Sequence, residues 1–136
     1  MAKRILIVED HPIVSESLSR IISDFDRDVE CLCASSASKG LAFLNGKSFD
    51  LVILDINLPD MNGTEFCKIA KSRFPELRIV AITSIAQRHV VEKMLNQYVN
   101  GFILKTTDMD DILGGIRHVL NGGGLYLGKG VKDLMK

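Results

Sequence analysis

The chain has 136 residues, of which 46% are hydrophobic and 25% are charged, and its 17 Lys plus Arg residues balance its 17 Asp plus Glu residues. This length and composition predict one ordinary globular domain and exclude a disordered or fibrous chain. The net charge of +0 argues against a large nucleic-acid-binding surface, because such domains carry a basic excess. No apolar run approaches the roughly 18 residues of a membrane span, so we expect no membrane contact and a cytoplasmic location.

The first part of the chain alternates apolar strands with amphipathic helices. Residues 3–8 form an apolar run that predicts a strand, and Pro12 follows where the first turn of a helix tolerates its missing N–H group. Apolar residues at helical spacing extend that helix to Phe25. Residues 29–34 alternate in polarity, which is typical of an edge strand, and Ser36 can then cap a second helix.

Residues 51–55, with the sequence Leu-Val-Ile-Leu-Asp, predict the central strand of the fold. A run that is apolar at every position favours a strand covered on both faces, as parallel strands of α/β proteins are. Pro59 and Gly63 then end the strand and turn the chain. We therefore expect Asp55 at the carboxyl end of this strand, the edge at which open α/β sheets bind their ligands.

The second part of the chain continues the alternation. The predicted elements are a helix over 66–74, a strand over 78–83, a helix over 86–95, a strand over 101–104 and a helix over 109–120. Thr107 and Asp110 have the spacing of a capping box for the last of these helices. The same helix contains Gly114 and Gly115, which either make it easy to shift or permit close packing against a neighbour.

Five strands alternating with five helices predict a doubly wound α/β domain with a parallel sheet. Parallel strands end at the same edge, so the polar residues at the strand ends should form one site. These residues are Glu9, Asp10, Asp55, Thr83 and Lys105.

The chemistry of this cluster points to a cation and a phosphoryl group. Three carboxylates repel one another unless a cation lies between them, and oxygen ligands at an open site favour Mg²⁺. Lys105 and the Thr83 hydroxyl would complement the oxygens of a phosphoryl group. Asp55, the most central carboxylate, is the expected nucleophile and would form an aspartyl phosphate.

These residues, in this order and at these strand ends, resemble the receiver domain of bacterial two-component response regulators over residues 3–121. The resemblance implies a flavodoxin-like sheet with strand order 2-1-3-4-5. It also implies that Asp55 accepts a phosphoryl group from a phosphohistidine on a sensor histidine kinase or phosphotransfer protein. Glu9, Asp10, Asp55 and the backbone carbonyl of Asn57 would hold Mg²⁺, and Thr83 and Lys105 would contact the phosphate.

The segments Glu9-Asp10-His11-Pro12 and Gly101-Phe-Ile-Leu-Lys105 resemble most the NarL/FixJ/LuxR group, whose receivers precede a helix-turn-helix DNA-binding domain. The resemblance implies transcriptional output, a homodimer formed on phosphorylation, and DNA contact only through an output domain outside these residues. The face made by the fourth helix, fifth strand and fifth helix would relay the phosphorylation state.

Three residues depart from the common receiver pattern. Phe102 stands where Tyr is frequent, so an aromatic switch there would lack a hydroxyl group. Ser84 stands where Ala or Gly is usual and adds a polar group beside the phosphate. Thr106 follows the lysine where many receivers have Pro.

His11 lies beside the acid pair, but a neutral imidazole is a poor ligand for Mg²⁺, so we expect a surface residue at the start of a helix.

The resemblance divides the chain into a receiver domain over residues 1–121 and a linker over 122–136 that ends with the start of a helix. The chain is then either part of a longer regulator or a stand-alone receiver that acts through protein contacts.

Two other function classes share parts of the pattern. A phosphatase of the haloacid-dehalogenase type needs a second Asp two residues after the nucleophile, where this chain has Asn57. A flavodoxin-like electron carrier is disfavoured, because three carboxylates would face the negatively charged flavin phosphate. We therefore expect no enzyme activity beyond the chain's own phosphoryl transfer and slow autodephosphorylation.

Overall fold

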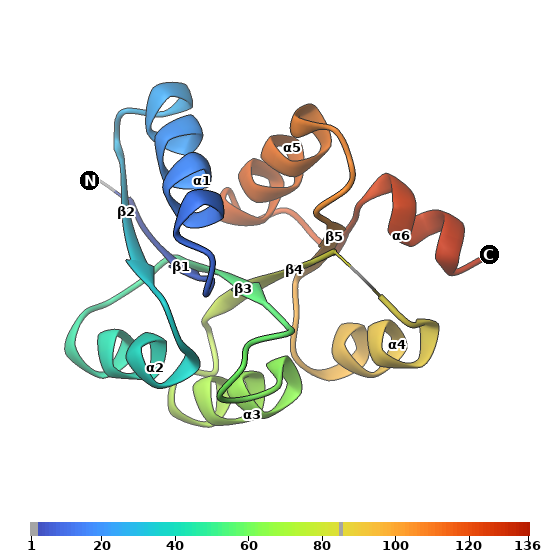
Figure 1. Ribbon diagram of the computed structural model, residues 1–136, viewed down its shortest axis with the longest axis horizontal. Helices are drawn as coiled ribbons and strands as arrows, with labels where there is room; N and C mark the ends of the chain where they lie inside the picture. Colours follow the sequence, from blue (N-terminus) through green and yellow to red (C-terminus); the bar gives the residue numbers. More distant parts are fainter. Residues whose placement is uncertain (1–2, 85) are drawn as a thin grey trace.

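The computed structural model describes residues 3–84 and 86–136, in which strands and helices alternate along the chain (Figure 1). The strands are β1 (Lys3–Val8), β2 (Val29–Ala34), β3 (Leu51–Asp55), β4 (Arg78–Thr83), β5 (Gly101–Leu104) and β6 (Tyr126–Leu127). The helices are α1 (Pro12–Phe25), α2 (Ala37–Gly46), α3 (Gly63–Arg73), α4 (Arg88–Gln97), α5 (Met109–Leu120) and α6 (Lys129–Leu134). The strands pair in parallel in the order β2-β1-β3-β4-β5-β6.

Helices cover both faces of the sheet, so the protein has a separate hydrophobic core on each side. Figure 1 shows α1 and α5 on one face and α2, α3 and α4 on the other. Because side chains alternate along a strand, Val52 and Leu54 pack with the second group of helices and Leu51 and Ile53 with the first. Every residue of β3 is buried, which explains why this strand is apolar throughout until Asp55.

Two of the predicted helix starts are confirmed, and the predicted cap of a third helix is wrong. Pro12 is the first residue of α1, and the Ser36 side chain accepts a hydrogen bond from the Lys39 amide at the start of α2. The predicted capping box of Thr107 and Asp110 is wrong. Asp108 caps α5 instead, since its carboxylate accepts a hydrogen bond from the Asp111 amide at 2.8 Å.

The expected count of five strands and five helices is corrected to six of each among the described residues. Residues 122–136, predicted as a linker that ends with the start of a helix, contain β6 and α6. The backbone amides of Tyr126 and Gly128 donate hydrogen bonds to the carbonyl groups of Asn100, which precedes β5, and of Phe102 within β5. Pairing with β6 therefore satisfies an otherwise open strand edge. A two-residue strand is too short for its alternation to be recognised in a sequence.

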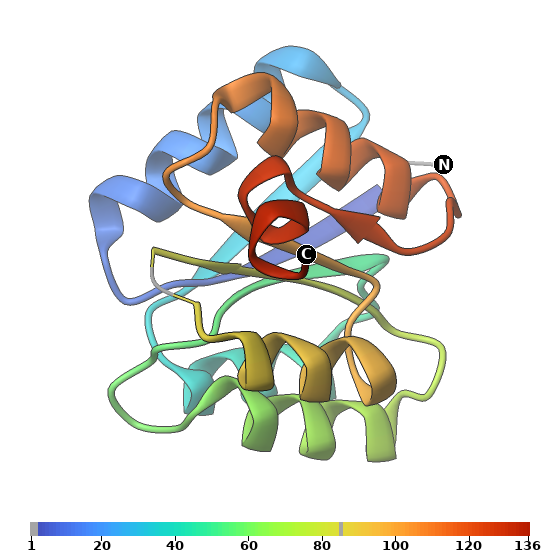
Figure 2. The same cartoon turned by 90° about the vertical axis from the view of Figure 1, so that its right-hand side faces the viewer.

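Helix α6 packs over the end of the sheet. Figure 2 shows it between α5 and α4, and its Val131 side chain is fully buried. Gly122, with a φ of +85°, lies in the turn that brings the chain back after α5, a backbone conformation that favours glycine. Within residues 3–84 and 86–136, no helix is both long enough and apolar enough to cross a membrane.

Candidate functional site

The polar residues at four strand ends lie together at the carboxyl edge of the sheet. Glu9 follows β1 directly, Asp55 and Thr83 are the last residues of β3 and β4, and Lys105 follows β5. Since β1, β3, β4 and β5 are neighbours in a parallel sheet, their ends converge. The structure thus brings Glu9, Asp55 and Lys105 into direct contact.

Lys105 is the cation at the centre of this cluster. Its Nζ donates hydrogen bonds to Asp55 Oδ2 at 3.1 Å and to the two Glu9 carboxylate oxygens at 3.1 and 2.9 Å. Glu9 is only 2% exposed and Asp55 only 4%, so both carboxylates are largely withdrawn from water. A shared ammonium group offsets part of the cost of placing these two negative charges side by side.

The pKa values of the three groups reflect burial and mutual contact. Burial raises the pKa of Glu9, and the adjacent Asp55 adds to the rise. Burial also acts upward on Asp55, but its hydrogen bonds with Glu9, the Asn57 amide and Lys105 together hold its pKa below the ordinary value. Burial alone would lower the pKa of Lys105, yet the two carboxylates keep it raised. These directions favour the charged form of Lys105 and the ionised form of Asp55.

Thr83 and Asn57 form the opposite side of the site. The Asn57 side-chain amide donates a 2.7 Å hydrogen bond to Thr83 Oγ1, and its backbone amide donates to Asp55 Oδ1 at 3.0 Å. Sequence reasoning assigned a role only to the carbonyl group of Asn57 and missed its side chain. The only signal available was an amide side chain two residues after the predicted nucleophile.

Two further sequence-predicted residues, Ser84 and Phe102, lie outside this group of contacts. Ser84 is exposed and lines a cleft of about 460 Å³ together with Asn57, Ile56, Gln87 and Val90. The Phe102 ring is fully buried within the core on the α2, α3 and α4 side of the sheet, away from the carboxylates.

Asp10 and His11 complete the acidic end of the site. Asp10 Oδ1 is buried and has no hydrogen-bond partner among the described residues. His11 Nδ1 lies 3.3 Å from this oxygen and 2.9 Å from Glu9 Oε1, although its side chain is 67% exposed. The exposure agrees with the expected surface position at the start of a helix, but the sequence did not predict the contact with Glu9.

The donor atoms fit a divalent cation. One ligand atom from each of Glu9, Asp10, His11 and Asp55 lies within 4.8 Å of the others. A buried carboxylate oxygen without a partner is costly, by about 1–3 kcal/mol, and a bound cation would satisfy it. Carboxylate oxygens at a partly open site are the ligands that Mg²⁺ accepts in proteins. Lys105, while charged, offers no lone pair to a metal.

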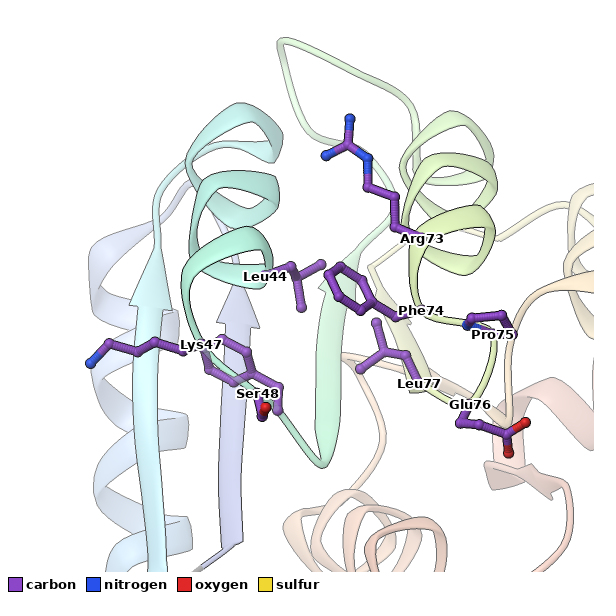
Figure 3. A pocket seen from close by; sticks show the side chains of 9 residues that line it. Leu44, Lys47, Ser48, Arg73, Phe74, Pro75, Glu76 and Leu77 are labelled. Carbon is purple, nitrogen blue, oxygen red and sulfur yellow. The ribbon is translucent and has the colours of Figure 1, made fainter.

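The best-defined apolar cavity lies elsewhere. Figure 3 shows a pocket of about 360 Å³ between the segments that precede β3 and β4, with Leu44, Phe74 and Leu77 lining it. These segments lead into the amino ends of the two strands, so the pocket lies at the opposite edge of the sheet from Asp55. Its charged groups, on Lys47, Arg73 and Glu76, do not form a catalytic constellation.

A search of protein-family models matches residues 5–117 of this chain to the response regulator receiver domain. Among curated proteins, the transcriptional regulatory protein ComA of Bacillus subtilis is 31% identical over 122 residues, which are 88% of this chain and 57% of ComA. The chain spans only 57–61% of the length of the curated relatives it matches.

Solved structures of response regulators are similar to this chain. A CheY-like response regulator receiver domain protein from Methanospirillum hungatei superposes with a TM-score of 0.80 at 32% identity, over 89% of this chain and 95% of that chain. A LuxR-family response regulator from Aurantimonas has a TM-score of 0.89 at 22% identity, over 99% of this chain and 96% of that chain, and this likeness concerns the fold alone.

Proposed function

The chain belongs to the response regulator receiver domain family, and from this premise we propose that Asp55 accepts a phosphoryl group and that the chain acts as a phosphorylation-dependent switch. One observation carries the proposal: the Lys105 ammonium is hydrogen-bonded to the buried, ionised Asp55 carboxylate at the edge where the strands end. A buried carboxylate paired with a movable cation is suited to nucleophilic phosphoryl transfer.

The proposed transfer step uses the side chains at the carboxyl edge of the sheet. An Asp55 oxygen attacks the phosphorus atom of a phosphohistidine, a new P–O bond forms, and the P–N bond breaks with its electron pair returning to the imidazole nitrogen. Lys105 would pass from Asp55 Oδ2 to a phosphoryl oxygen and keep its charge paired there. The Thr83 hydroxyl, now a partner of Asn57, would donate to a second phosphoryl oxygen.

Glu9, Asp10, Asp55 and the Asn57 carbonyl group would hold Mg²⁺ at this edge. The bound ion supplies charge neutralisation for the phosphoryl oxygens as they approach the carboxylates. Ser84, which is exposed and follows Thr83 directly, would contact the phosphate and influence its lifetime.

The phosphodonor we propose is a phosphohistidine on a sensor histidine kinase or a phosphotransfer protein. The family of the chain and the placement of Asp55 at the carboxyl edge of the sheet support this. A phosphatase of the haloacid-dehalogenase type gains no support, since the Asn57 amide bonds Thr83 and offers no carboxylic acid.

The output we propose is control of transcription through a DNA-binding domain outside these residues, with a homodimer formed on phosphorylation. Curated relatives named as transcriptional regulatory proteins support this reading. The face formed by α4, β5 and α5, with Phe102 behind it, would carry the signal.

Intact-mass spectrometry after incubation with acetyl phosphate and Mg²⁺ tests the acceptor. The wild-type chain should gain the mass of one phosphoryl group, and Asp55→Asn should gain none because the amide is not a nucleophile. Chelation of Mg²⁺ should prevent labelling. Asp133→Asn, which alters an exposed carboxylate on α6, should label normally. Full labelling of Asp55→Asn would overturn the assignment.

A further inference from the structure

His11 approaches the proposed metal site more closely than its exposed position requires. Its ring is 67% exposed, yet Nδ1 points to the cluster and lies 2.9 Å from Glu9 Oε1 and 3.3 Å from Asp10 Oδ1. A hydrogen bond from the Nδ1–H group to Glu9 Oε1 accounts for the shorter of these distances. A metal ion that displaced this proton would make the imidazole nitrogen a ligand of the same cluster.

The distances match the edges of a coordination polyhedron. Two ligand atoms each about 2.1 Å from one ion, at a right angle, lie about 3.0 Å apart. The separations of His11 Nδ1 from Glu9 Oε1 and Asp10 Oδ1 bracket this value. One ligand atom of Asp55 falls in the same group, since all four atoms lie within 4.8 Å of one another.

The contacts of Lys105 leave ligand positions on the carboxylates free, although its charge repels a second cation. Lys105 bonds both Glu9 oxygens, but a carboxylate oxygen carries two lone pairs, so Glu9 Oε1 can accept from Lys105 and bind an ion as well. Asp10 Oδ1, buried and without a hydrogen-bond partner among the described residues, is available from the other side.

A donor set of one imidazole nitrogen and three carboxylates differs from an all-oxygen set in its metal preference. Mg²⁺ gains little from a nitrogen ligand, whereas imidazole suits the later first-row divalent ions. We propose that His11 Nδ1 is a direct ligand at this site and that it makes the site favour a transition-metal ion such as Co²⁺ over Mg²⁺. The proposal rests on the phosphoacceptor function only for the location of the metal.

Isothermal titration of the metal-free chain with Co²⁺ and with Mg²⁺ tests the ligand role. His11→Gln should weaken Co²⁺ binding at least about tenfold and leave the Mg²⁺ affinity within about twofold, because only Co²⁺ gains from the nitrogen. The visible absorption of bound Co²⁺ should shift in the variant as a nitrogen ligand is lost. His89→Gln, which removes an exposed imidazole on α4, should change neither affinity nor spectrum.

Two results would overturn the proposal. Equal weakening of Co²⁺ and Mg²⁺ would show that His11 only orients Glu9 through a hydrogen bond, and unchanged binding of both would show that it has no role. His11→Asp adds a safeguard, since an oxygen ligand should raise the Mg²⁺ affinity without restoring the Co²⁺ spectrum. These titrations need no phosphorylation, so loss of labelling with an intact metal preference would count against the proposed function alone.

Discussion

Among single residues, Lys105 sets the charge balance of the acidic site. Its ammonium group bonds Glu9 and Asp55 simultaneously and its side chain is only 19% exposed, so it stabilises two carboxylates that would otherwise repel each other. A divalent cation would have to share these carboxylates with Lys105. The positive charge of Lys105 should therefore oppose metal binding.

Replacement of Lys105 by alanine should separate these two effects. We expect Lys105→Ala to bind Mg²⁺ about tenfold more tightly, because a repulsion of about 1–2 kcal/mol between two cations in a partly screened site is removed. The variant should nevertheless be phosphorylated more slowly, since the phosphoryl oxygens lose a cationic partner. Titration calorimetry and labelling rates give both quantities. Lys132→Ala, an exposed lysine on α6, is the control, and weaker Mg²⁺ binding in Lys105→Ala would contradict the argument.

The sequence was sufficient to predict which backbone positions form the site. Residues at the ends of parallel strands converge whatever their separation along the chain, which is why Glu9, Asp55, Thr83 and Lys105 could be grouped. Side-chain directions in the loops follow from no such rule. The hydrogen bond from the Asn57 side chain to Thr83 and the approach of His11 to Glu9 therefore required the structure.

At the scale of elements, α5 is shaped by its two adjacent glycines, which play different roles. A Cβ atom on Gly115 would lie 2.6 Å from Ile103 Cδ1 of β5 and 2.7 Å from the Tyr126 ring of β6. The nearest neighbour of a Cβ atom on Gly114 would be the Tyr126 hydroxyl, at 3.8 Å, an ordinary contact. The structure thus favours close packing as the reason for Gly115 and leaves only Gly114 as a local weakness of the helix.

Alanine at each position should change stability in opposite directions. Gly114→Ala should raise the free energy of unfolding by up to about 1 kcal/mol, because alanine favours the helix. Gly115→Ala should lower it by about 1–3 kcal/mol, since the added methyl group forces α5 away from β5. Urea unfolding measures both. A stabilised Gly115→Ala variant would show that α5 has free space against the sheet.

Asp111 joins α5 to the C-terminal elements. This carboxylate is only 4% exposed and accepts hydrogen bonds from the Tyr126 hydroxyl at 2.6 Å, Thr107 Oγ1 at 2.7 Å and the Lys129 amide at 3.0 Å. The network connects the loop after Lys105 with β6 and α6. Sequence patterns did not reveal it, because a polar residue within a helix is usually exposed.

The Tyr126 hydroxyl should make the attachment of β6 dependent on pH. Burial and the bond to Asp111 raise the pKa of Tyr126 to about 12 from an ordinary value of 10.0. A pKa that is raised by folding contributes stability fully below the unfolded value and loses it as the pH rises through the folded value. Below a pH of about 10, we expect the free energy of unfolding of the wild-type chain to exceed that of Tyr126→Phe by about 1–2 kcal/mol. This difference should disappear as the pH rises towards about 12.

Urea unfolding of both proteins at several pH values measures this difference. The phenylalanine variant keeps the ring packed near His118, so only the hydroxyl group is tested. A difference that stays constant or grows as the medium becomes more alkaline would show that the hydroxyl does not stabilise the fold through Asp111.

At the scale of the whole molecule, the proposed site lies at one edge of the sheet between two cores, and the proposed output face is partly covered by the chain's own C-terminal segment. Helix α6 lies between α4 and α5 (Figure 2). It packs closely against Leu104, the last residue of β5, because a Cβ atom added to Gly130 of α6 would lie only 2.6 Å from Leu104 Cδ1. Any movement of β5 that follows Lys105 must therefore disturb α6. This segment is also what separates the observed fold from the five-stranded sheet that the sequence predicted.

Hydrogen exchange should show this coupling. With beryllofluoride and Mg²⁺ bound as a phosphate mimic, we expect changed amide protection across residues 86–120 and also in residues 126–134, because the added negative charge and its electronegative acceptor atoms draw Thr83 and Lys105 inward. The Asp55→Asn variant under the same conditions is the control. Changes limited to the loops after Asp10, Asp55, Thr83 and Lys105 would show that these residues bind phosphate without switching.

If Asp55 carries the phosphoryl group, chemical localisation will identify it. Borohydride reduces an aspartyl phosphate to homoserine, so the wild-type chain would be labelled with acetyl phosphate and Mg²⁺, reduced, digested and sequenced by mass spectrometry. We expect homoserine at position 55 and at no other carboxylate. Reduction at Glu9 or Asp10 instead, or a labelled chain with an unmodified Asp55, would contradict it.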